Sequence, residues 1–240
     1  MCIFRNLKGI LFDSGRVLNS PRTGHWFIPP NFFKYVDKEK FNLLSEDTVG
    51  RAFQRAFQYL SQQNFILTET EEFEHFIEFY KLFSNELPSL ELSQTDVLGI
   101  ASDTVYNDDK FYFYDDVFET IPKLSKNYKL GIVSDTWVSL HRVFKNIGLR
   151  NYFSTFVMSS IVGVVKPHDL MFNTALSELK IKPEEALFID DSIVNVKSAK
   201  KMGLNAILMA RGEKSNLDME PMKIGQLDDL FVVLDLDKGK

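Results

Sequence analysis

Short apolar runs that end in turn or charged residues recur along the chain, and they constrain its fold most. They cover residues 9–12, 130–133, 156–158, 186–189 and 206–209. Runs of this length without polar alternation are typical of strands buried on both faces. Helix-period stretches lie between them, at residues 116–127, 138–147, 169–179 and 192–202. This alternation predicts an α/β fold with a doubly wound parallel sheet.

Residues 20–104 interrupt the alternation with helical patterns only. Apolar residues recur at helical spacing within 41–62 and 71–86, and many of the chain's 22 phenylalanines fall in this segment. A small helical bundle needs large side chains to bury enough surface, so we expect these rings to form a core more readily than an aromatic substrate pocket. The segment is therefore predicted to be an inserted helical module.

The composition is that of an ordinary globular protein, and its charge makes small-molecule chemistry the more natural expectation. The net charge of -5 argues against binding of nucleic acid or of a membrane surface, because both need concentrated Lys and Arg. The one cysteine, Cys2, excludes an intramolecular disulfide and a cysteine zinc site. No stretch reaches the roughly 20 apolar residues that span a bilayer. A cytoplasmic location is expected, and oligomeric state is not predicted.

Polar residues follow several of the predicted strands. Asp13, Ser134 and the pair Asp190 and Asp191 each stand at a strand end. In open α/β sheets the ligand crevice lies at the carboxyl ends of the strands, so these side chains are expected to converge there. Each residue alone has a simpler interpretation as a helix cap or turn residue, so the hypothesis of a shared site depends on their occurring together.

Four segments carry these residues in order: ILFDSGRVL (10–18), LGIVSDT (130–136), KPHDLMF (166–172) and LFIDDSIVNV (187–196). In order, spacing and strand placement they resemble the motifs of the haloacid dehalogenase superfamily. With the helical insertion, the resemblance covers essentially the whole chain. It implies a Rossmann-like core of residues 1–19 and 105–240, and an all-helical cap of residues 20–104.

The resemblance assigns a chemical role to the first three motifs. Asp13 is implied to be a covalent nucleophile that attacks phosphorus, which splits one difficult displacement into two easier steps. Ser134 and Lys166 would bind the oxygens of the transferred group, with the lysine supplying positive charge where negative charge accumulates. Asp135 is expected beside them in the substrate site.

The resemblance also implies a magnesium site. A hard cation prefers oxygen ligands, here the Asp13 carboxylate, the backbone carbonyl of Gly15 and Asp191. Asp190 is expected to be a ligand or a close neighbour. Asn195 is expected outside the ligands, in contact with them.

The chain departs from the family's phosphatases directly after the nucleophile. Gly15 stands where they have an aspartate that protonates the leaving oxygen and later activates water, and Arg16 stands where they have a glycine. A backbone carbonyl at position 15 can still bind magnesium, but general acid–base help, typically worth about 10² to 10⁴ in rate, is lost. An alkyl phosphate with a poor leaving group is therefore expected to react slowly.

Three explanations of this departure remain open. His25 could supply a surrogate acid, because histidine titrates near neutral pH. The substrate could have a good leaving group, such as an acyl or aryl phosphate. The chain could instead bind a phosphorylated ligand without efficient turnover. Arg16 and His25 are both expected to be able to contact an anionic substrate.

These observations predict a magnesium-dependent, phosphatase-type hydrolase that cleaves a phosphoric ester or anhydride of a small metabolite. One alternative is hydrolysis of a carbon–halogen or carbon–phosphorus bond, since relatives of those kinds also lack the acid. The dehalogenases lack the paired acids found here at Asp190 and Asp191, and no motif singles out a Schiff-base lysine for phosphonate hydrolysis. A weakly catalytic ligand-binding protein is the other alternative.

Overall fold

The chain folds into two compact units, and its computed structural model describes residue 4 and residues 6–236, so Cys2 lies outside the described residues. The core unit comprises Met1–Ser20, Phe113–Thr136 and His141–Lys240, and the helical unit comprises Pro21–Tyr112 and Trp137–Leu140. The segment expected to form the cap thus lies almost entirely in the helical unit. That unit also takes residues 105–112 and 137–140, which were expected in the core.

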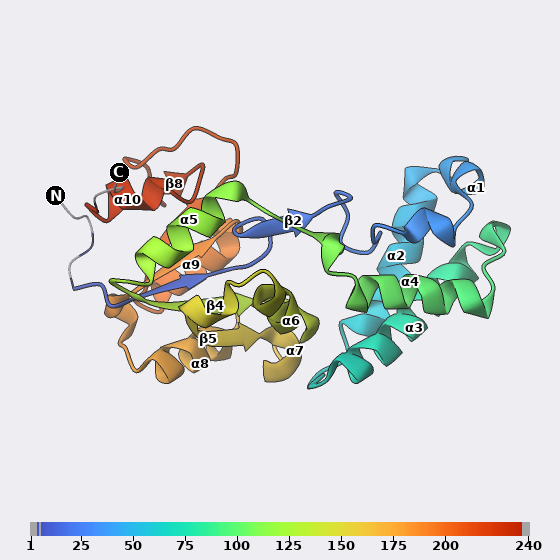
Figure 1. Cartoon of the computed structure of the whole chain (residues 1–240), viewed down its shortest axis with the longest axis horizontal. Coiled ribbons are helices and arrows are strands. Elements are labelled where there is room, and N and C mark those ends of the chain that lie inside the picture. Colours follow the sequence, from blue (N-terminus) through green and yellow to red (C-terminus); the bar gives the residue numbers. More distant parts are fainter. Residues whose placement is uncertain (1–3, 5, 237–240) are drawn as a thin grey trace. The chain divides into compact units, whose positions relative to one another are not determined.

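A six-stranded sheet forms the centre of the core unit (Figure 1). Its strands, in spatial order, are β5 (Phe153–Met158), β4 (Lys129–Ser134), β1 (Gly9–Phe12), β6 (Ala186–Asp190), β7 (Asn205–Met209) and β8 (Lys223–Ile224). All neighbouring strands pair in parallel. The strand order runs outward from β1 in both directions, which makes the end of β1 the switch point where such sheets bind ligands. The predicted fold class is confirmed.

Helices cover both faces of this sheet. They are α5 (Asp115–Leu124), α6 (Ser139–Asn146), α7 (Ser159–Val162), α8 (Asp169–Leu179), α9 (Ile193–Lys201) and α10 (Asp229–Val233). Leu11 on β1 belongs to a buried cluster with residues of α8 and α9. Phe12 faces the other way and contacts Phe153, whose ring meets Phe144 of α6. The four helices predicted from periodicity correspond to α5, α6, α8 and α9, and each predicted end lies within three residues of the observed end.

Gly131 in β4 shows how tightly the sheet is packed. A Cβ atom there would lie 2.4 Å from Cγ2 of Thr155 and 2.7 Å from Cδ2 of Leu11. Real Cβ atoms are not found at such distances, so the close approach of these two side chains depends on glycine.

The helical unit is built around phenylalanine rings. Its helices are α1 (Lys38–Asn42), α2 (Glu46–Leu60), α3 (Glu69–Glu86) and α4 (Gln94–Tyr106). Phe53 on α2 and Phe83 on α3 lie 4.5 Å apart between ring centroids, inside a cluster of buried residues from these helices. The rings therefore form a core, as expected.

Capping residues set where these helices begin. The Ser45 side chain accepts from the Thr48 N–H and starts α2, so the helical pattern of residues 41–62 is broken into two helices rather than one. Thr68 and Glu71 form a capping box at the start of α3. The break before α2 was not predicted because the apolar stripe continues across it.

The chain passes between the two units at four places. Two of these passages run through β2 (Asn19–Pro21) and β3 (Phe111–Phe113), which pair in a small separate sheet. The third follows Thr136, where Trp137 enters the helical unit and its ring lies 5.1 Å from that of Phe76, and the fourth follows Leu140, where the chain returns to the core unit. The helical unit is therefore assembled from segments distant in sequence.

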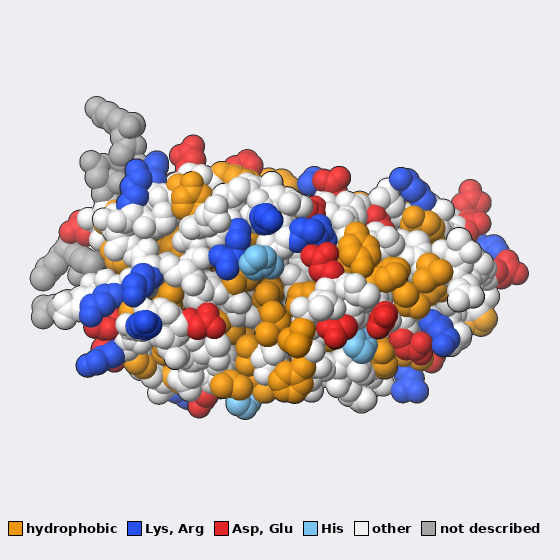
Figure 2. Space-filling view, turned by 60° about the horizontal axis from the view of Figure 1, so that its bottom comes forward, with side chains coloured by type: hydrophobic (Ala, Val, Ile, Leu, Met, Phe, Trp, Pro, Cys, Tyr) orange, Lys and Arg blue, Asp and Glu red, His pale blue; other side chains and the backbone are white. Residues whose placement is uncertain are grey.

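The surface carries both signs of charge. On the face shown in Figure 2, Lys and Arg side chains are scattered among Asp and Glu side chains rather than gathered in one basic area. This pattern agrees with the net charge of -5. Among the described residues, no helix combines the length and the apolar character that crossing a bilayer requires.

Glu72 is a buried carboxylate that ties Ser139 into the helical unit. Its two oxygens accept hydrogen bonds from the Ser139 N–H (2.8 Å) and Oγ (2.7 Å). Burial raises the pKa of Glu72 above its ordinary value of 4.5, although Lys110 and the two hydrogen bonds oppose the shift. The native state therefore binds a proton more tightly than the unfolded chain does.

Glu72→Gln should change the pH dependence of stability. Because the native pKa is raised, the wild-type free energy of unfolding should fall as pH rises from 4.5 through the native pKa. Each tenfold difference in proton affinity between the native and unfolded states contributes about 1.4 kcal/mol to this fall. In Glu72→Gln this component should be absent. Urea unfolding between pH 4.5 and 8, followed by tryptophan fluorescence, measures it, because Trp26 and Trp137 both lie in the helical unit.

Glu74→Gln, at an exposed position of the same helix, is the matched control for loss of one charge. Parallel pH profiles for wild type and Glu72→Gln would contradict a raised pKa at Glu72.

Candidate active site

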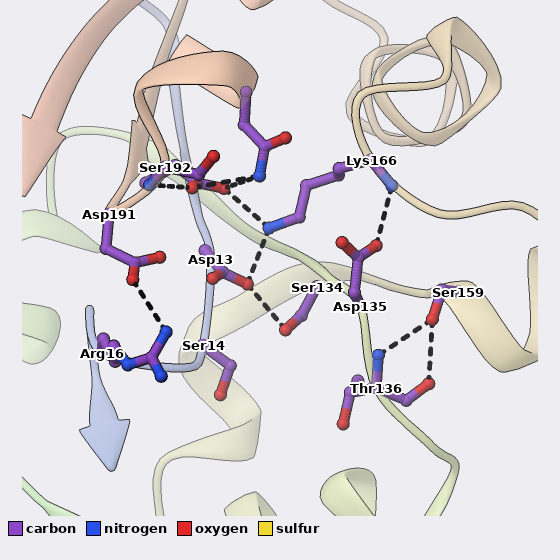
Figure 3. Close-up of polar contacts among 12 residues, drawn as sticks. Asp13, Ser14, Arg16, Ser134, Asp135, Thr136, Ser159, Lys166, Asp191 and Ser192 are labelled. Atoms are coloured by element: carbon purple, nitrogen blue, oxygen red, sulfur yellow. Dashed lines mark hydrogen bonds and ion pairs between the residues drawn. The ribbon is translucent and has the colours of Figure 1, made fainter. Parts of the chain in front are cut away.

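Parallel pairing brings the strand-end residues to one edge of the sheet in the core unit. Phe12 stands level with Ile132 of β4 on one side and with Ile189 of β6 on the other. Asp13 follows directly, and its N–H donates to the Ile189 carbonyl (2.9 Å). The carboxyl ends of β1, β4 and β6 therefore present their polar residues together (Figure 3).

The carboxylate of Asp13 is held through one of its two oxygens. Ser134 Oγ donates to Asp13 Oδ1 at 2.7 Å, and Lys166 Nζ lies 2.8 Å from the same atom. Within the described part of the chain, Oδ2 accepts no hydrogen bond. The carboxylate is thus fixed in orientation with one oxygen still available.

Lys166 is a buried cation between two carboxylates. Its side chain is 1% exposed, and Nζ lies 2.7 Å from Asp190 Oδ2 as well as close to Asp13. Burial alone would lower the pKa of Lys166, but the neighbouring carboxylates outweigh it and raise the pKa above its ordinary value. The Lys166 N–H also donates to Asp135 Oδ1 (2.8 Å), which joins the second and third motifs.

Both carboxylate oxygens of Asp190 accept hydrogen bonds from other residues of the chain. Its Oδ1 accepts from the Ser192 N–H (2.7 Å) and from Asn195 Nδ2 (3.1 Å), and its Oδ2 accepts from Lys166 and from Asn195 Nδ2 (3.1 Å). Burial raises the pKa of Asp190, and the charge of Asp13 raises it further, while Lys166 opposes the shift. Asn195 thus contacts Asp190, and its place next to the metal ligands stays a prediction.

Asp13, Asp190 and Asp191 form a cluster suited to a metal ion. Each offers a carboxylate oxygen, and these oxygens all lie within 4.8 Å of one another. Burial and repulsion by Asp13 raise the pKa of Asp191, although Arg16 opposes this. With Asp135 nearby, the described residues bring four carboxylates together with two cations, Lys166 and Arg16. A divalent cation with oxygen ligands fits both the charge and the donor atoms.

The turn after Asp13 is held by several hydrogen bonds and includes a left-handed residue. Arg16 has φ +54°, and its N–H donates to the Asn19 carbonyl (2.6 Å). Buried Asn19 also donates through Nδ2 to Ser14 Oγ (2.6 Å), and the Ser14 carbonyl accepts from the Leu18 N–H (2.8 Å). A non-glycine residue in this conformation costs about 1–2 kcal/mol.

The side chain of Arg16 is held only weakly. Its Nη1 lies 3.5 Å from Asp191 Oδ2, and the side chain is 65% exposed. Exposed ion pairs contribute about 0–1 kcal/mol, which does not exceed the conformational cost of placing arginine at this position. The contact with Asp191 therefore does not by itself account for an arginine here.

Two residues that hold the loops of the site through hydrogen bonds were not predicted. Arg211 pairs with Asp116 and donates to the Val17 carbonyl, behind the turn that follows the nucleophile. Ser159 Oγ accepts from the Thr136 N–H (2.9 Å) and fixes the loop after Ser134. Neither residue belongs to a recognisable motif, and only their long-range contacts reveal them.

His25 lies in the helical unit, among aromatic rings. Its Nδ1 accepts from the Phe27 N–H (3.2 Å), and its ring centroid lies 4.6 Å from that of Phe53. Burial lowers the pKa of His25, which favours the neutral ring. Its role as a surrogate acid stays a prediction, as do the other assigned site roles.

Comparison with known proteins agrees with the motifs. Residues 45–209 match the family model described as haloacid dehalogenase-like hydrolase. The chain belongs to this family. The match covers more than half of the sequence, and it confirms the membership that the four motifs predicted.

Among curated members of the family, the chain is similar to the glyceraldehyde 3-phosphate phosphatase of Methanopyrus kandleri. The identity is 31% over 145 residues, which are 56% of this chain and 60% of that protein. It is also 28% identical over 135 residues to the pyrophosphatase PpaX of Bacillus anthracis, covering 54% of this chain and 62% of that protein. The matched region thus spans about 60% of the length of these relatives.

Solved structures of the family share the fold. The HAD phosphatase from Thermococcus onnurineus has a TM-score of 0.66 and 24% identity, covering 97% of this chain and 100% of its own. The HAD-hydrolase YfnB from Bacillus subtilis, solved with magnesium bound, has a TM-score of 0.65 and 18% identity, with the same coverage. At these identities the likeness concerns the fold alone.

Lys166→Met should destabilise the core unit strongly when no divalent cation is present. Removing the ammonium leaves Asp13 and Asp190 buried without compensation, which typically costs about 3–5 kcal/mol. Urea unfolding in EDTA, followed by far-UV circular dichroism, measures the loss.

The double variant Lys166→Met/Asp190→Asn should recover part of the stability, because one uncompensated charge is then absent. Lys126→Met, at an exposed lysine of the same unit, is the matched control. A Lys166→Met variant as stable as wild type would contradict the role of Lys166 as the central cation.

Proposed function

We propose that this chain is a magnesium-dependent, phosphatase-type hydrolase that acts on a small phosphorylated metabolite through an aspartyl-phosphate on Asp13. The observation that carries the proposal is the Asp13 carboxylate, fixed through Oδ1 by Ser134 and Lys166 and open at Oδ2. Family membership supports it, and relatives named as phosphatases agree with it.

Asp13 acts as the nucleophile in this proposal. An oxygen of its carboxylate attacks phosphorus, and the leaving group departs with the electrons of the broken bond. The Ser134 hydroxyl and the Lys166 ammonium bind oxygens of the transferred group and stabilise the charge that accumulates on them. Water then hydrolyses the aspartyl-phosphate and restores the carboxylate.

Asp13, the Gly15 carbonyl and Asp191 would hold the magnesium ion. Asp190 is already engaged by Lys166, Ser192 and Asn195, so in this proposal it positions the lysine rather than binding the ion. When bound, magnesium would supply positive charge to the phosphoryl oxygens and relieve repulsion among the carboxylates.

Position 15 is a glycine, which has no side chain that could donate a proton to the leaving oxygen. Gly15 therefore restricts efficient turnover to substrates whose leaving group departs without a proton. The same feature favours a second candidate function, in which the chain binds a phosphorylated ligand and turns it over weakly. The proposed partner is a small phosphorylated metabolite, rather than nucleic acid or a membrane, and the proposed location is the cytoplasm.

Activity should depend on Asp13 and be limited by Gly15. With magnesium, wild type should hydrolyse an aryl phosphate at least about 10²-fold faster than an alkyl phosphate, because only the aryl oxygen leaves readily without an acid. Asp13→Asn should abolish hydrolysis. Gly15→Asp should increase alkyl phosphate turnover by about 10-fold or more. Steady-state release of inorganic phosphate measures all three.

Asp169→Asn, which removes an exposed carboxylate outside the cluster, is the matched control and should turn over substrate as wild type does. Hydrolysis that persists in Asp13→Asn would contradict the covalent mechanism. Wild type inert toward every phosphate ester would favour the binding function.

Metal binding should depend on Asp191. Asp191→Asn removes one of the two proposed carboxylate ligands, so this variant should bind magnesium at least about 10-fold more weakly than wild type. Isothermal titration calorimetry without substrate measures this independently of activity. Asp169→Asn, in a carboxylate at the start of α8 outside the cluster, is the matched control. Equal affinity of wild type and Asp191→Asn would contradict the assignment of Asp191.

A further inference from the structure

The turn after the nucleophile combines a missing acid with an added cation. Gly15 offers no side chain to the leaving oxygen, and the next residue, Arg16, places a guanidinium at the same site. The turn that carries them is fixed by the backbone hydrogen bond from Arg16 to Asn19 (2.6 Å). The two departures from the family's phosphatases therefore lie together in space as well as in sequence.

The guanidinium lies apart from the groups proposed to bind the transferred phosphoryl group. Lys166 and Ser134 approach Asp13 from one side, whereas Arg16 and Asp191 lie on the other (Figure 3). The Arg16 side chain is 65% exposed, and its one ion pair among the described residues is the 3.5 Å contact with Asp191. Asp191 is also a proposed metal ligand, and a carboxylate bound to a cation attracts a guanidinium less. Arg16 is then free to bind another anion.

The missing acid restricts which leaving group can depart. Without a proton donor, the leaving oxygen departs as an anion, and an alkoxide is a strong base, about as basic as hydroxide. A phosphate monoester, which titrates near pH 6, is a far weaker base and departs without protonation. It also carries its own negative charge, which a planar guanidinium binds in bidentate geometry.

We propose that Arg16 binds the leaving group and that this group is itself a phosphate, so that the substrate is a phosphoanhydride. This inference rests on the proposed function. An Asp13 oxygen forms a bond to the terminal phosphorus while the bridging phosphorus–oxygen bond breaks, and the electron pair stays with the departing phosphate. Water then attacks the aspartyl-phosphate, which releases inorganic phosphate, a proton and the free carboxylate.

Binding of methylenediphosphonate, which has two phosphorus groups and no cleavable bridging oxygen, tests the inference without turnover. At saturating magnesium, Arg16→Gly should weaken its binding about 10- to 100-fold, because a charge-assisted contact is lost. Binding of orthophosphate should change by less than about threefold, since it occupies the Ser134 and Lys166 side. Glycine suits the left-handed backbone at position 16, so this variant should fold. Isothermal titration calorimetry measures both ligands.

Arg16→Lys, which keeps the charge but not the fork, should lose less methylenediphosphonate affinity than Arg16→Gly. Lys126→Ala, which removes an exposed charge elsewhere on the core unit, is the control and should bind as wild type does. Equal affinity of wild type and Arg16→Gly for methylenediphosphonate, or an equal loss for orthophosphate, would overturn the inference.

Turnover gives the second measurement. In Arg16→Gly, kcat/KM for inorganic pyrophosphate should fall about 10- to 100-fold, while kcat/KM for p-nitrophenyl phosphate and acetyl phosphate should change by less than about threefold. An equal loss on all three substrates would overturn the inference, since Arg16 would then act on the transferred group or the metal site. If wild type hydrolyses none of them, the proposed function fails, and the methylenediphosphonate titration alone decides whether Arg16 recognises a second phosphate.

Discussion

The ion pairs of Lys166 with Asp13 and Asp190 are the interaction on which the rest of the site depends. Parallel pairing of β1 and β6 forces two carboxylates to the same edge of the sheet, where burial and mutual repulsion raise the pKa of Asp190. The ammonium, 1% exposed and 2.7–2.8 Å from both, compensates their negative charge in the protein interior. Because the Lys166 N–H also donates to Asp135, the same residue fixes the loop that follows Ser134 relative to the nucleophile.

The core sheet could be predicted well because both signals in the sequence were local. Short apolar runs and helical periodicity located the strands and helices, and the topology rule for parallel sheets placed Asp13, Ser134 and Asp190 together. Features decided by distant contacts were missed. Residues 137–140 join the helical unit because Trp137 packs on Phe76 and Ser139 bonds Glu72, which lies 67 positions away in the chain. The break before α2 was missed for a different reason, because a single local cap, Ser45, interrupts an apolar stripe that continues across it.

The roles of the two adjacent acids also required the structure. Asp190 and Asp191 are the same residue type, and the motif alone did not decide whether Asp190 is a metal ligand or a close neighbour of the ligands. Side chains alternate in direction along the strand end, so Asp190 points into the protein, where three residues hydrogen-bond both of its carboxylate oxygens. Among the described residues, the one cation paired with Asp191 is the distant guanidinium of Arg16. Hydrogen-bond saturation, rather than residue type, therefore distinguishes the acid that organises the site from the acid that can still accept a ligand.

Gly15 and Arg16 together change the way in which negative charge on a leaving oxygen can be stabilised. A carboxylic acid neutralises that charge by transferring a proton, which helps most when the leaving group is strongly basic. A guanidinium cannot give up its proton at neutral pH and acts only by electrostatic attraction and hydrogen bonding. It therefore favours a weakly basic leaving group that already carries negative charge in the substrate, as a phosphate does. A loss of the acid alone would be explained equally well by decay toward a binding protein, but decay does not account for an arginine held in a left-handed turn at the mouth of the same site.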